Sequence, residues 1–279
     1  MHDVVIIGAG ELGGAVAHVL ARRDCVRSIR LIDETGRAAA GKALDIAQAG
    51  PMEGFATQLT GSADLSRAAG ASVVVVADRM GGGEWQGDEG WLLLKRLSAS
   101  AGAVVVCAGA CQRELIDRGV RELSFRRDRL FGSAPEALAG GARALVALAA
   151  AGSPRDVALS VLGVPPHHTV IPWEDATMAG FALTRTLDEP TRRRLSARVT
   201  ALWPPGPYAL ATAATMVIEA MAGRSRRIAS CFVAPEQAAA ARHRTAALPV
   251  RLGPTGIVDV LAPALSVVEQ IALDNAVML

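Results

Sequence analysis

The chain has 279 residues, of which 51% are hydrophobic and 20% are charged, so it can bury a large core and is not disordered. Its 29 basic and 27 acidic residues nearly cancel, whereas a nucleic-acid groove depends on surplus positive charge. The longest apolar runs are shorter than the roughly 20 residues of a membrane span, and an apolar strand begins at Val4 without a basic leader. These features argue against nucleic acid and membrane as partners.

The cysteines are scattered without the paired spacing of a zinc site or a disulfide framework. We expect each to be a small buried side chain, with a redox pair between the second and third as the alternative. We therefore expect a cytoplasmic protein without a metal site. A mean hydropathy of +0.30 is high for a monomer, and the interfaces of a homodimer or homotetramer would explain it. The four residues are Cys25, Cys107, Cys111 and Cys231.

Short apolar strands alternate with helical patterns in the first half of the chain. Because the strands are apolar on both faces, they predict a parallel sheet covered on both sides by crossover helices. Right-handed crossovers then give a Rossmann-type doubly wound sheet. The predicted strands are Val4–Ile7, Ile29–Ile32, Val73–Val76 and Val104–Cys107, and the predicted helices are Leu12–Arg23, Arg37–Gln48 and Glu89–Ser98.

The second half mixes helices and strands without a clear alternation. We expect an α/β protein with a nucleotide-binding domain over residues 1–140 and a smaller mixed α/β domain over residues 141–279. A helix is predicted to begin near Asp188, which would cap it. The other predicted helices are Pro135–Ala151, Tyr208–Ala222 and Ala264–Ala276, and the predicted strands are Val157–Leu162, Thr169–Ile171, Ile228–Val233 and Leu248–Leu252.

A G-x-G-x-x-G motif follows the first strand and opens the first helix. In such a motif Gly8 makes the tight turn, Gly10 lets a pyrophosphate approach the backbone, and Gly13 lets helix and strand pack closely. The helix amides then face the phosphates. The alternative is a glycine turn kept only for packing.

An acidic residue, Asp33, lies twenty residues after the third glycine, where its carboxylate would bind the adenosine ribose. That carboxylate favours NAD over NADP, and Arg37 would weaken this preference. The predicted NAD-binding residues are Gly8, Gly10, Glu11, Leu12, Gly13, Asp33 and Ala77.

Several ordered segments resemble the lactate/malate dehydrogenase family, especially the lactate-dehydrogenase-like bacterial malate dehydrogenases. The likeness runs along nearly the whole chain in the same order as in the family. The segments that carry it are Gly41–Ile46, Pro51–Phe55, Thr60-Gly61, Ser153–Val157, Val161–Gly163, Ala179-Gly180, Tyr208-Ala209, Glu219-Ala220 and Leu248–Gly253.

The resemblance implies hydride transfer between a nicotinamide and a small 2-hydroxy or 2-oxo acid such as malate or oxaloacetate. That chemistry needs a histidine, oriented by a carboxylate, to exchange the hydroxyl proton. It also needs one arginine to bind the substrate carboxylate and a second to stabilise the developing oxyanion. Here the resemblance implies that His167 is the catalytic histidine, or His168 if the alignment shifts by one residue. It also implies that Arg143 binds the substrate carboxylate.

The sequence departs from the family pattern at these same parts. Gly81 and Gly87 stand where the loop after the third predicted strand carries its two arginines, and Ala108-Gly109 replaces an Asn-Pro. The family's L-D-x-x-R motif keeps an arginine, at Arg143, only if one residue is inserted, and its aspartate has no counterpart. Arg79 is a candidate replacement donor or an anchor of the loop, which would be a flexible lid or a shortened loop that does not close.

Two main readings of function follow, together with a third. The leading hypothesis is that the chain is an NAD-dependent oxidoreductase of the lactate/malate dehydrogenase type, and the alternative is a catalytically impaired, dinucleotide-binding homologue that acts as a sensor or a partner subunit. The third reading is altered chemistry on a substrate that lacks a carboxylate. Losing several catalytic groups together predicts very low turnover of malate or lactate, because each lost transition-state donor typically lowers the rate by about 10²–10³.

Overall fold

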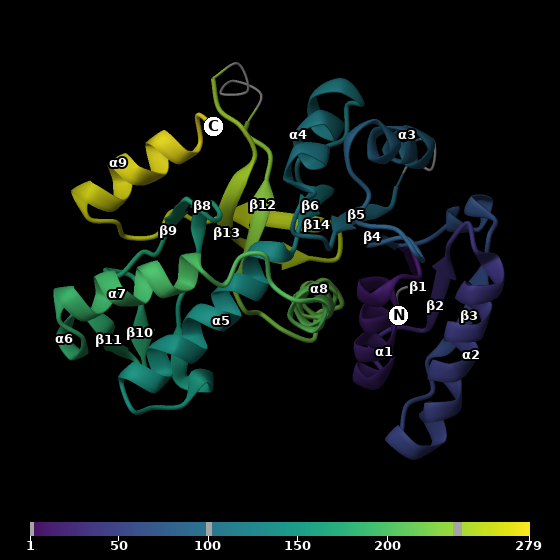
Figure 1. Ribbon diagram of the computed structural model, residues 1–279, viewed down its shortest axis with the longest axis horizontal. Coiled ribbons are helices and arrows are strands. Elements are labelled where there is room, and N and C mark those ends of the chain that lie inside the picture. The colour runs from purple at the N-terminus through teal and green to yellow at the C-terminus, as the bar shows by residue number, and fades with distance from the viewer. Residues whose placement is uncertain (1–2, 99–101, 237–241) are drawn as a thin grey trace.

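The computed structural model describes residues 3–98, 102–236 and 242–279 (Figure 1). The first half forms a parallel sheet in the order β3-β2-β1-β4-β5-β6. The strand order reverses at β1, which pairs with β2 on one side and β4 on the other, and such a reversal leaves a crevice at the carboxyl ends of the strands. The strands are β1 Asp3–Ile7, β2 Ser28–Ile32, β3 Gln58–Ser62, β4 Val73–Val76, β5 Val104–Cys107 and β6 Leu130–Gly132.

Helices cover both faces of this sheet. In Figure 1, α1, α2 and α8 lie on one side of it, and α3 and α4 lie together on the other. All four residues of β4 and all four of β5 are buried, as expected for strands covered on both faces. The helices of the first half are α1 Glu11–Arg23, α2 Gly36–Glu53, η1 Leu65–Ala68, α3 Gly87–Ser98 and α4 Arg113–Glu122.

The second half extends the same sheet with antiparallel strands in the order β6-β12-β13-β8-β9, while β14 pairs with β13. A separate small sheet has the order β11-β10-β7. The strands are β7 Val157–Ala158, β8 Leu162–Val164, β9 His168–Val170, β10 Thr177–Met178, β11 Phe181–Ala182, β12 Ala229–Val233, β13 Ala246–Gly253 and β14 Gly256–Val260.

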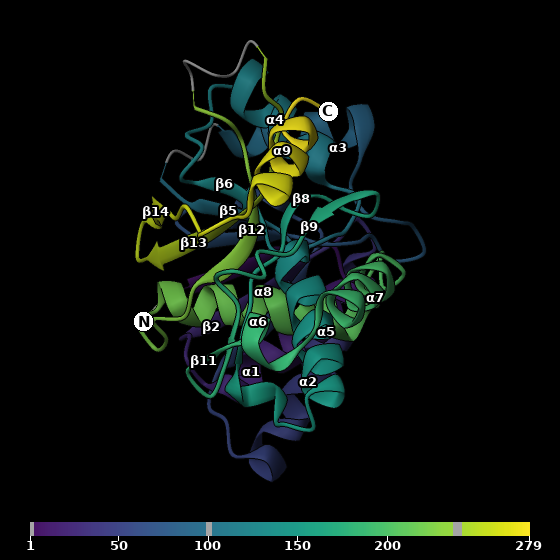
Figure 2. The same ribbon diagram turned by 90° about the vertical axis from the view of Figure 1, so that its left-hand side faces the viewer.

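Helices of the second half lie on opposite sides of β8 and β9. Helix α9 covers these strands on one side, and α5 lies on the other (Figures 1 and 2). The larger of two apolar cores surrounds the central sheet and includes α8 and β12, whereas the smaller one joins α5 to α7 around Trp173. The helices are α5 Ala134–Ala149, η2 Pro154–Asp156, α6 Leu183–Thr186, α7 Glu189–Thr200, α8 Pro207–Met221 and α9 Val267–Ala276.

The fold class and the four strands predicted in the first half are confirmed. Residues 157–162, predicted as one strand, are instead split between β7 and β8, which belong to different sheets. The split falls where the Val161 amide donates to the Ser230 hydroxyl on β12 rather than to a backbone carbonyl oxygen. Helix α7 begins as predicted, because the Asp188 carboxylate accepts from the Thr191 amide. The division at residues 140 and 141 stays a prediction.

The last helix begins later than predicted, at Val267 rather than at Ala264. Ser266 and Glu269 form a capping box there, in which each side chain accepts a hydrogen bond from the other residue's backbone amide. Strands β3 and β6 and helix α4 were not expected from the sequence. Strand β3 is an edge strand with mixed polar residues, and β6 has only three residues, so neither strand shows a clear apolar pattern.

The cysteines are all free. Cys25, Cys107 and Cys231 are buried as expected, and burial raises their pKa values, but Cys111 is exposed, so its expected burial was wrong. Among the described residues, no helix is both long and apolar enough to cross a membrane. The same part of the chain contains no group of three or more His, Cys, Asp or Glu residues placed to hold a metal ion.

Gly13 has a packing role that can be tested directly. A Cβ at this position would lie 2.1 Å from the Gly8 carbonyl oxygen, so Gly13→Ala must displace backbone. We expect the variant to lose about 2–3 kcal/mol of unfolding free energy, measured by urea denaturation. Gly41→Ala is the control, because its Cβ would meet nothing within 4 Å on helix α2, and alanine there should add about 0.5–1 kcal/mol. Equal effects of the two substitutions would contradict the packing argument.

Candidate functional site

The glycine turn connects β1 to α1 and contacts the segment that follows β4, where the Gly10 amide donates to the Asp78 carbonyl oxygen at 3.0 Å. Gly8 has a φ of +104°, and its amide donates to the Ile32 carbonyl oxygen at 2.7 Å. A Cβ on Gly8 would lie 2.1 Å from the Asp78 carbonyl oxygen, so only glycine fits this close approach. The turn therefore has the geometry that the motif predicts, with the α1 amides at the carboxyl edge of the sheet.

Asp33 lies at the end of β2 beneath this turn and is only 5% exposed. Its Oδ2 accepts from the amides of Ala9 at 2.9 Å and Met80 at 2.8 Å, and its Oδ1 accepts from the Thr35 amide at 2.9 Å. Burial alone would raise the pKa of this carboxyl, but the three amide hydrogen bonds outweigh it and hold the pKa below its ordinary value. The carboxylate thus binds the protein's own backbone at the place predicted for a ribose contact.

Asp78 lies two residues after the end of β4 and caps the first turn of α1. Its carboxylate accepts from the amides of Leu12 at 3.1 Å and Gly13 at 2.8 Å. A Cβ on Gly10 would lie between 2.3 and 2.7 Å from the carboxylate atoms of Asp78. The space that Gly10 leaves open is therefore filled by this side chain, and the helix amides already hold an anion.

The Glu84 carboxylate likewise accepts hydrogen bonds from backbone amides, here from those that follow the neighbouring strand, β5. Its two carboxylate oxygens accept from the amides of Ala110 at 2.9 Å and Cys111 at 2.8 Å. A Cβ on Gly109 would lie 2.2 Å from Glu84 Oε2, so glycine makes room for this carboxylate. Burial raises the pKa of Glu84, and the two amide hydrogen bonds oppose that rise.

The segment between these two acids is a tight hairpin. Asp78 and Glu84 face each other as an antiparallel bridge, and the Gly82 amide donates to the Arg79 carbonyl oxygen at 3.1 Å. The Arg79 guanidinium pairs with Glu89 at 2.5 Å and lies 4.9 Å from the centre of the Trp85 ring. Arg79 therefore anchors the loop, and the glycines of the predicted lid, Gly81 to Gly83, lie within its turn.

Three other residues complete the surroundings of the turn. Lys42 donates from Nζ to the carbonyl oxygens of Ala9 and Gly10, at 2.8 and 2.7 Å. Glu11 is the exposed first residue of α1, and buried Ala77 accepts from Gln112 through its carbonyl oxygen.

The N-terminus of a helix after a glycine turn is a common phosphate site. In this structure the two amides that would serve a phosphate are bound to the Asp78 carboxylate. The residues present therefore do not fit a dinucleotide in this arrangement of the loop.

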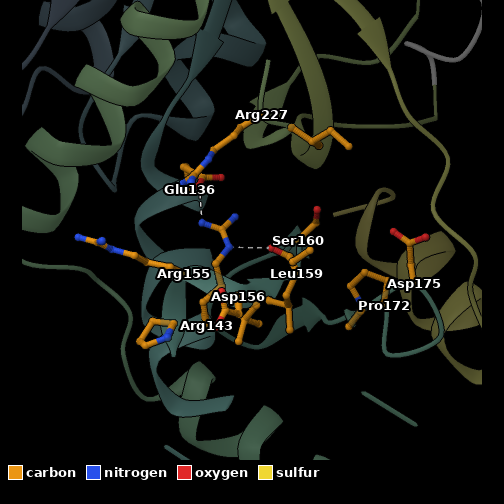
Figure 3. A pocket seen from close by; sticks show the side chains of 14 residues that line it. Glu136, Arg143, Arg155, Asp156, Leu159, Ser160, Pro172, Asp175 and Arg227 are labelled. Atoms are coloured by element: carbon orange, nitrogen blue, oxygen red, sulfur yellow. Dashed lines mark hydrogen bonds and ion pairs between the residues drawn. The ribbon is translucent and has the colours of Figure 1, made fainter. Parts of the chain in front are cut away.

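Arg143 belongs to α5, and its side chain lines a pocket of about 290 Å³ beside that helix (Figure 3). Its Nη1 donates to Glu136 at 2.7 Å, and its Nε donates to the Leu159 carbonyl oxygen at 3.1 Å. The Glu136 side chain is 1% exposed and also accepts from the Ser230 amide at 2.7 Å. The guanidinium is thus already paired with a buried carboxylate.

The two histidines lie elsewhere. His167 and His168 are exposed at the turn between β8 and β9, after the Pro165–Pro166 pair, and neither lines the Arg143 pocket. Within the described part of the chain neither ring makes a hydrogen bond or an ion pair. The structure does not gather the predicted proton relay and the predicted substrate anchor around one pocket, and their catalytic roles stay predictions.

Sequence reasoning missed the acids that define this region, namely Asp78, Glu84 and Glu136. One signal was present in the sequence, because Asp78 follows a fully apolar strand at the edge where the motif glycines were expected. A second signal was the seven-residue spacing of Glu136 and Arg143, which places them on one face of a helix. The amides that Glu84 and Glu136 bind are distant in sequence, and no spacing pattern indicates them.

The architecture is a Rossmann-type parallel sheet with a second, smaller part, which is the fold of the lactate and malate dehydrogenases. The structure matches malate dehydrogenase from Aeropyrum pernix with a TM-score of 0.87, 21% identity, and coverage of 98% of this chain and 95% of that one. It also matches the Cryptosporidium parvum lactate dehydrogenase solved with lactic acid and NAD, with a TM-score of 0.85, 18% identity, and coverage of 99% and 94%.

Sequence similarity is concentrated in a shorter stretch. The chain is 40% identical over 73 residues to malate dehydrogenase from Neorickettsia sennetsu, and 42% identical over 76 residues to that from Thioalkalivibrio sulfidiphilus. These stretches are 26% and 27% of this chain, which spans only about a quarter of the length of either relative, 23% and 25%. No family model matches the chain. The resemblance to the lactate/malate dehydrogenase family is confirmed, in fold throughout and in sequence over this stretch.

The bonding of Asp33 predicts a pH-dependent stability. In Asp33→Asn one neutral oxygen must replace two charged ones, so at least one of the three amides loses its acceptor and the others bind a weaker one, and we expect a loss of about 1–3 kcal/mol at neutral pH. Because the folded-state pKa is lowered, the wild-type advantage is complete above the ordinary Asp value of 3.8 and is lost as pH falls through the folded pKa. Urea denaturation of both proteins across this range measures the difference.

Asp64→Asn is the control for the Asp33 prediction, because Asp64 also accepts from a backbone amide but is fully exposed. It should change stability less at neutral pH. An Asp33→Asn protein as stable as the wild type at neutral pH would contradict the proposed bonding.

Proposed function

We propose that this chain is a catalytically impaired homologue of the lactate and malate dehydrogenases, which keeps their fold as a partner subunit in an assembly. The observation that carries the proposal is the ion pair between Arg143 and buried Glu136. A substrate carboxylate would have to compete with an internal one that is fixed in place by a further hydrogen bond from the Ser230 amide.

The other groups needed for hydride transfer to a 2-oxo acid support the same proposal. Within the described residues the imidazoles of His167 and His168 form no hydrogen bond or ion pair with a carboxylate, and an unoriented imidazole is a poor proton relay. Glycines 81 and 87 stand where the family carries loop arginines, and the loop of this chain forms a tight hairpin instead. A subunit that lacks these groups can still assemble, and we expect a homodimer or homotetramer when it is expressed alone.

Exposed apolar side chains on α9 favour an assembly role. Val267 and Val268 are 76% and 77% exposed, and Ile271 is 56% exposed. A cluster of apolar side chains at the surface commonly marks a contact with another protein.

The second candidate function is an NAD-dependent oxidoreductase of the same family, acting on malate, oxaloacetate or another small 2-hydroxy or 2-oxo acid. The intact turn of Gly8, Gly10 and Gly13 at the start of α1 favours it. In that reading NAD is held there and at Asp33, His167 relays the proton and Arg143 binds the substrate. It requires the acidic hairpin to leave the amides that it binds in this structure.

An activity assay separates the two candidates. We expect pure protein with NADH and a panel that includes oxaloacetate and pyruvate to show no loss of absorbance at 340 nm above the blank. An active malate dehydrogenase under the same conditions is the control, and the expected deficit is on the order of 10⁴-fold or more, since several transition-state contacts are missing. Turnover with any member of the panel would favour the oxidoreductase and contradict the proposal.

The role of Arg143 can be tested through stability alone. Arg143→Met would leave the Glu136 carboxylate buried without its cation, and we expect a loss of about 3–5 kcal/mol in urea denaturation. Arg155→Met removes an exposed arginine of the same pocket and should change stability by less than about 0.5 kcal/mol. If Arg143→Met were no more harmful than Arg155→Met, Arg143 would be free to bind a substrate.

A further inference from the structure

We propose that the carboxylates of Asp78 and Glu84 occupy the predicted nucleotide site at the carboxyl edge of the sheet. Asp78 is then a specificity-determining residue that excludes the phosphate groups of nucleotides from the α1 amides. This inference extends the proposed function, on which it rests, from the missing catalytic groups to the cofactor site itself. It concerns the edge of the sheet at the ends of β4 and β5, not the Arg143 pocket.

Two amides at the start of α1 are already occupied by a carboxylate of the same chain. The positive end of a helix binds an anion through its free amides, and each amide has one hydrogen to donate. The amides of Leu12 and Gly13 donate to Asp78, which belongs to the same rigid chain and does not have to be recruited from solution. A phosphate entering beside Gly10 would meet a carboxylate of like charge at the same position.

Glu84 closes the same site at a further point. Its carboxylate is bound to the amides of Ala110 and Cys111, beyond the end of β5, and fills the space beside Gly109. A ligand long enough to reach from α1 to β5 would have to displace both acids. Nucleotides that end at the α1 amides would have to displace only Asp78.

The two acids are held together. Asp78 and Glu84 are bridge partners across one hairpin, so the backbone that places one also places the other. The hairpin is fastened to α3 by the ion pair between Arg79 and Glu89. Because these contacts are intramolecular, they compete with a dissolved ligand at a high effective concentration.

The test is nucleotide binding by variants of the hairpin, measured by isothermal titration calorimetry. We expect ADP to bind Asp78→Ala at least about tenfold more tightly than the wild type, and NAD to gain most in Asp78→Ala with Glu84→Gln. The control is Asp188→Ala, which removes a carboxylate that caps α7 by the same kind of hydrogen bond. It should lower stability in the same way and leave nucleotide binding unchanged.

Urea denaturation confirms that each variant is folded before titration. Two outcomes would overturn the inference. In one, the wild type binds ADP or NAD as tightly as the hairpin variants; in the other, folded Asp78→Ala and the double variant bind neither nucleotide more tightly than the wild type. Because binding is read without a 2-oxo acid, failure here leaves the proposed loss of hydride transfer intact. Conversely, wild-type turnover with an NADH affinity that Asp78→Ala improves would overturn the proposed function alone.

Discussion

Carboxylate side chains of this protein accept hydrogen bonds from backbone amides and from a guanidinium, the kinds of donor that commonly bind anions. Asp78 binds the first amides of α1, Glu84 binds the amides after β5, and Glu136 binds the guanidinium of Arg143. Amides at the edge of the parallel sheet and a guanidinium on α5 need acceptors where they are buried, because unpaired buried donors are strongly destabilising. The positions of Asp78 and Glu84 also account for Gly10 and Gly109, whose missing Cβ atoms leave room for the two carboxylates.

The glycines of the motif have packing roles that do not depend on a ligand. Gly8 and Gly13 are required by backbone contacts between β1, β4 and α1 that have nothing to do with a nucleotide. Gly10 and Gly109 accommodate carboxylates of the same chain. A motif of this kind therefore predicts close packing of the helix against the strand. It predicts a phosphate-binding site only when the amides of the first helical turn have no other acceptor.

The sequence predicts the parts of this protein that depend on local pattern. The apolar strands, the glycine turn and the α7 cap at Asp188 depend on neighbouring residues, and the structure confirms them. The partners of Asp78, Glu84 and Glu136 lie 65, 26 and 94 residues away, respectively, at Gly13, Ala110 and Ser230, and chain pattern does not encode such distances. Arg143 differs in this respect, because its partner Glu136 lies only seven residues earlier on the same helix, a spacing that places both side chains on one face of α5.

The hydrogen bonds around Ser230 connect regions that are remote along the chain. Its amide donates to Glu136 on α5, and its hydroxyl accepts from the Val161 amide next to β8. Glu136 in turn holds Arg143, whose Nε binds the Leu159 carbonyl oxygen. Strand β12, helix α5 and the 159–161 segment thus share one buried network, and none of them can open without stranding polar groups in the others. These segments should consequently exchange their amide hydrogens as a single cooperative unit rather than fray one by one.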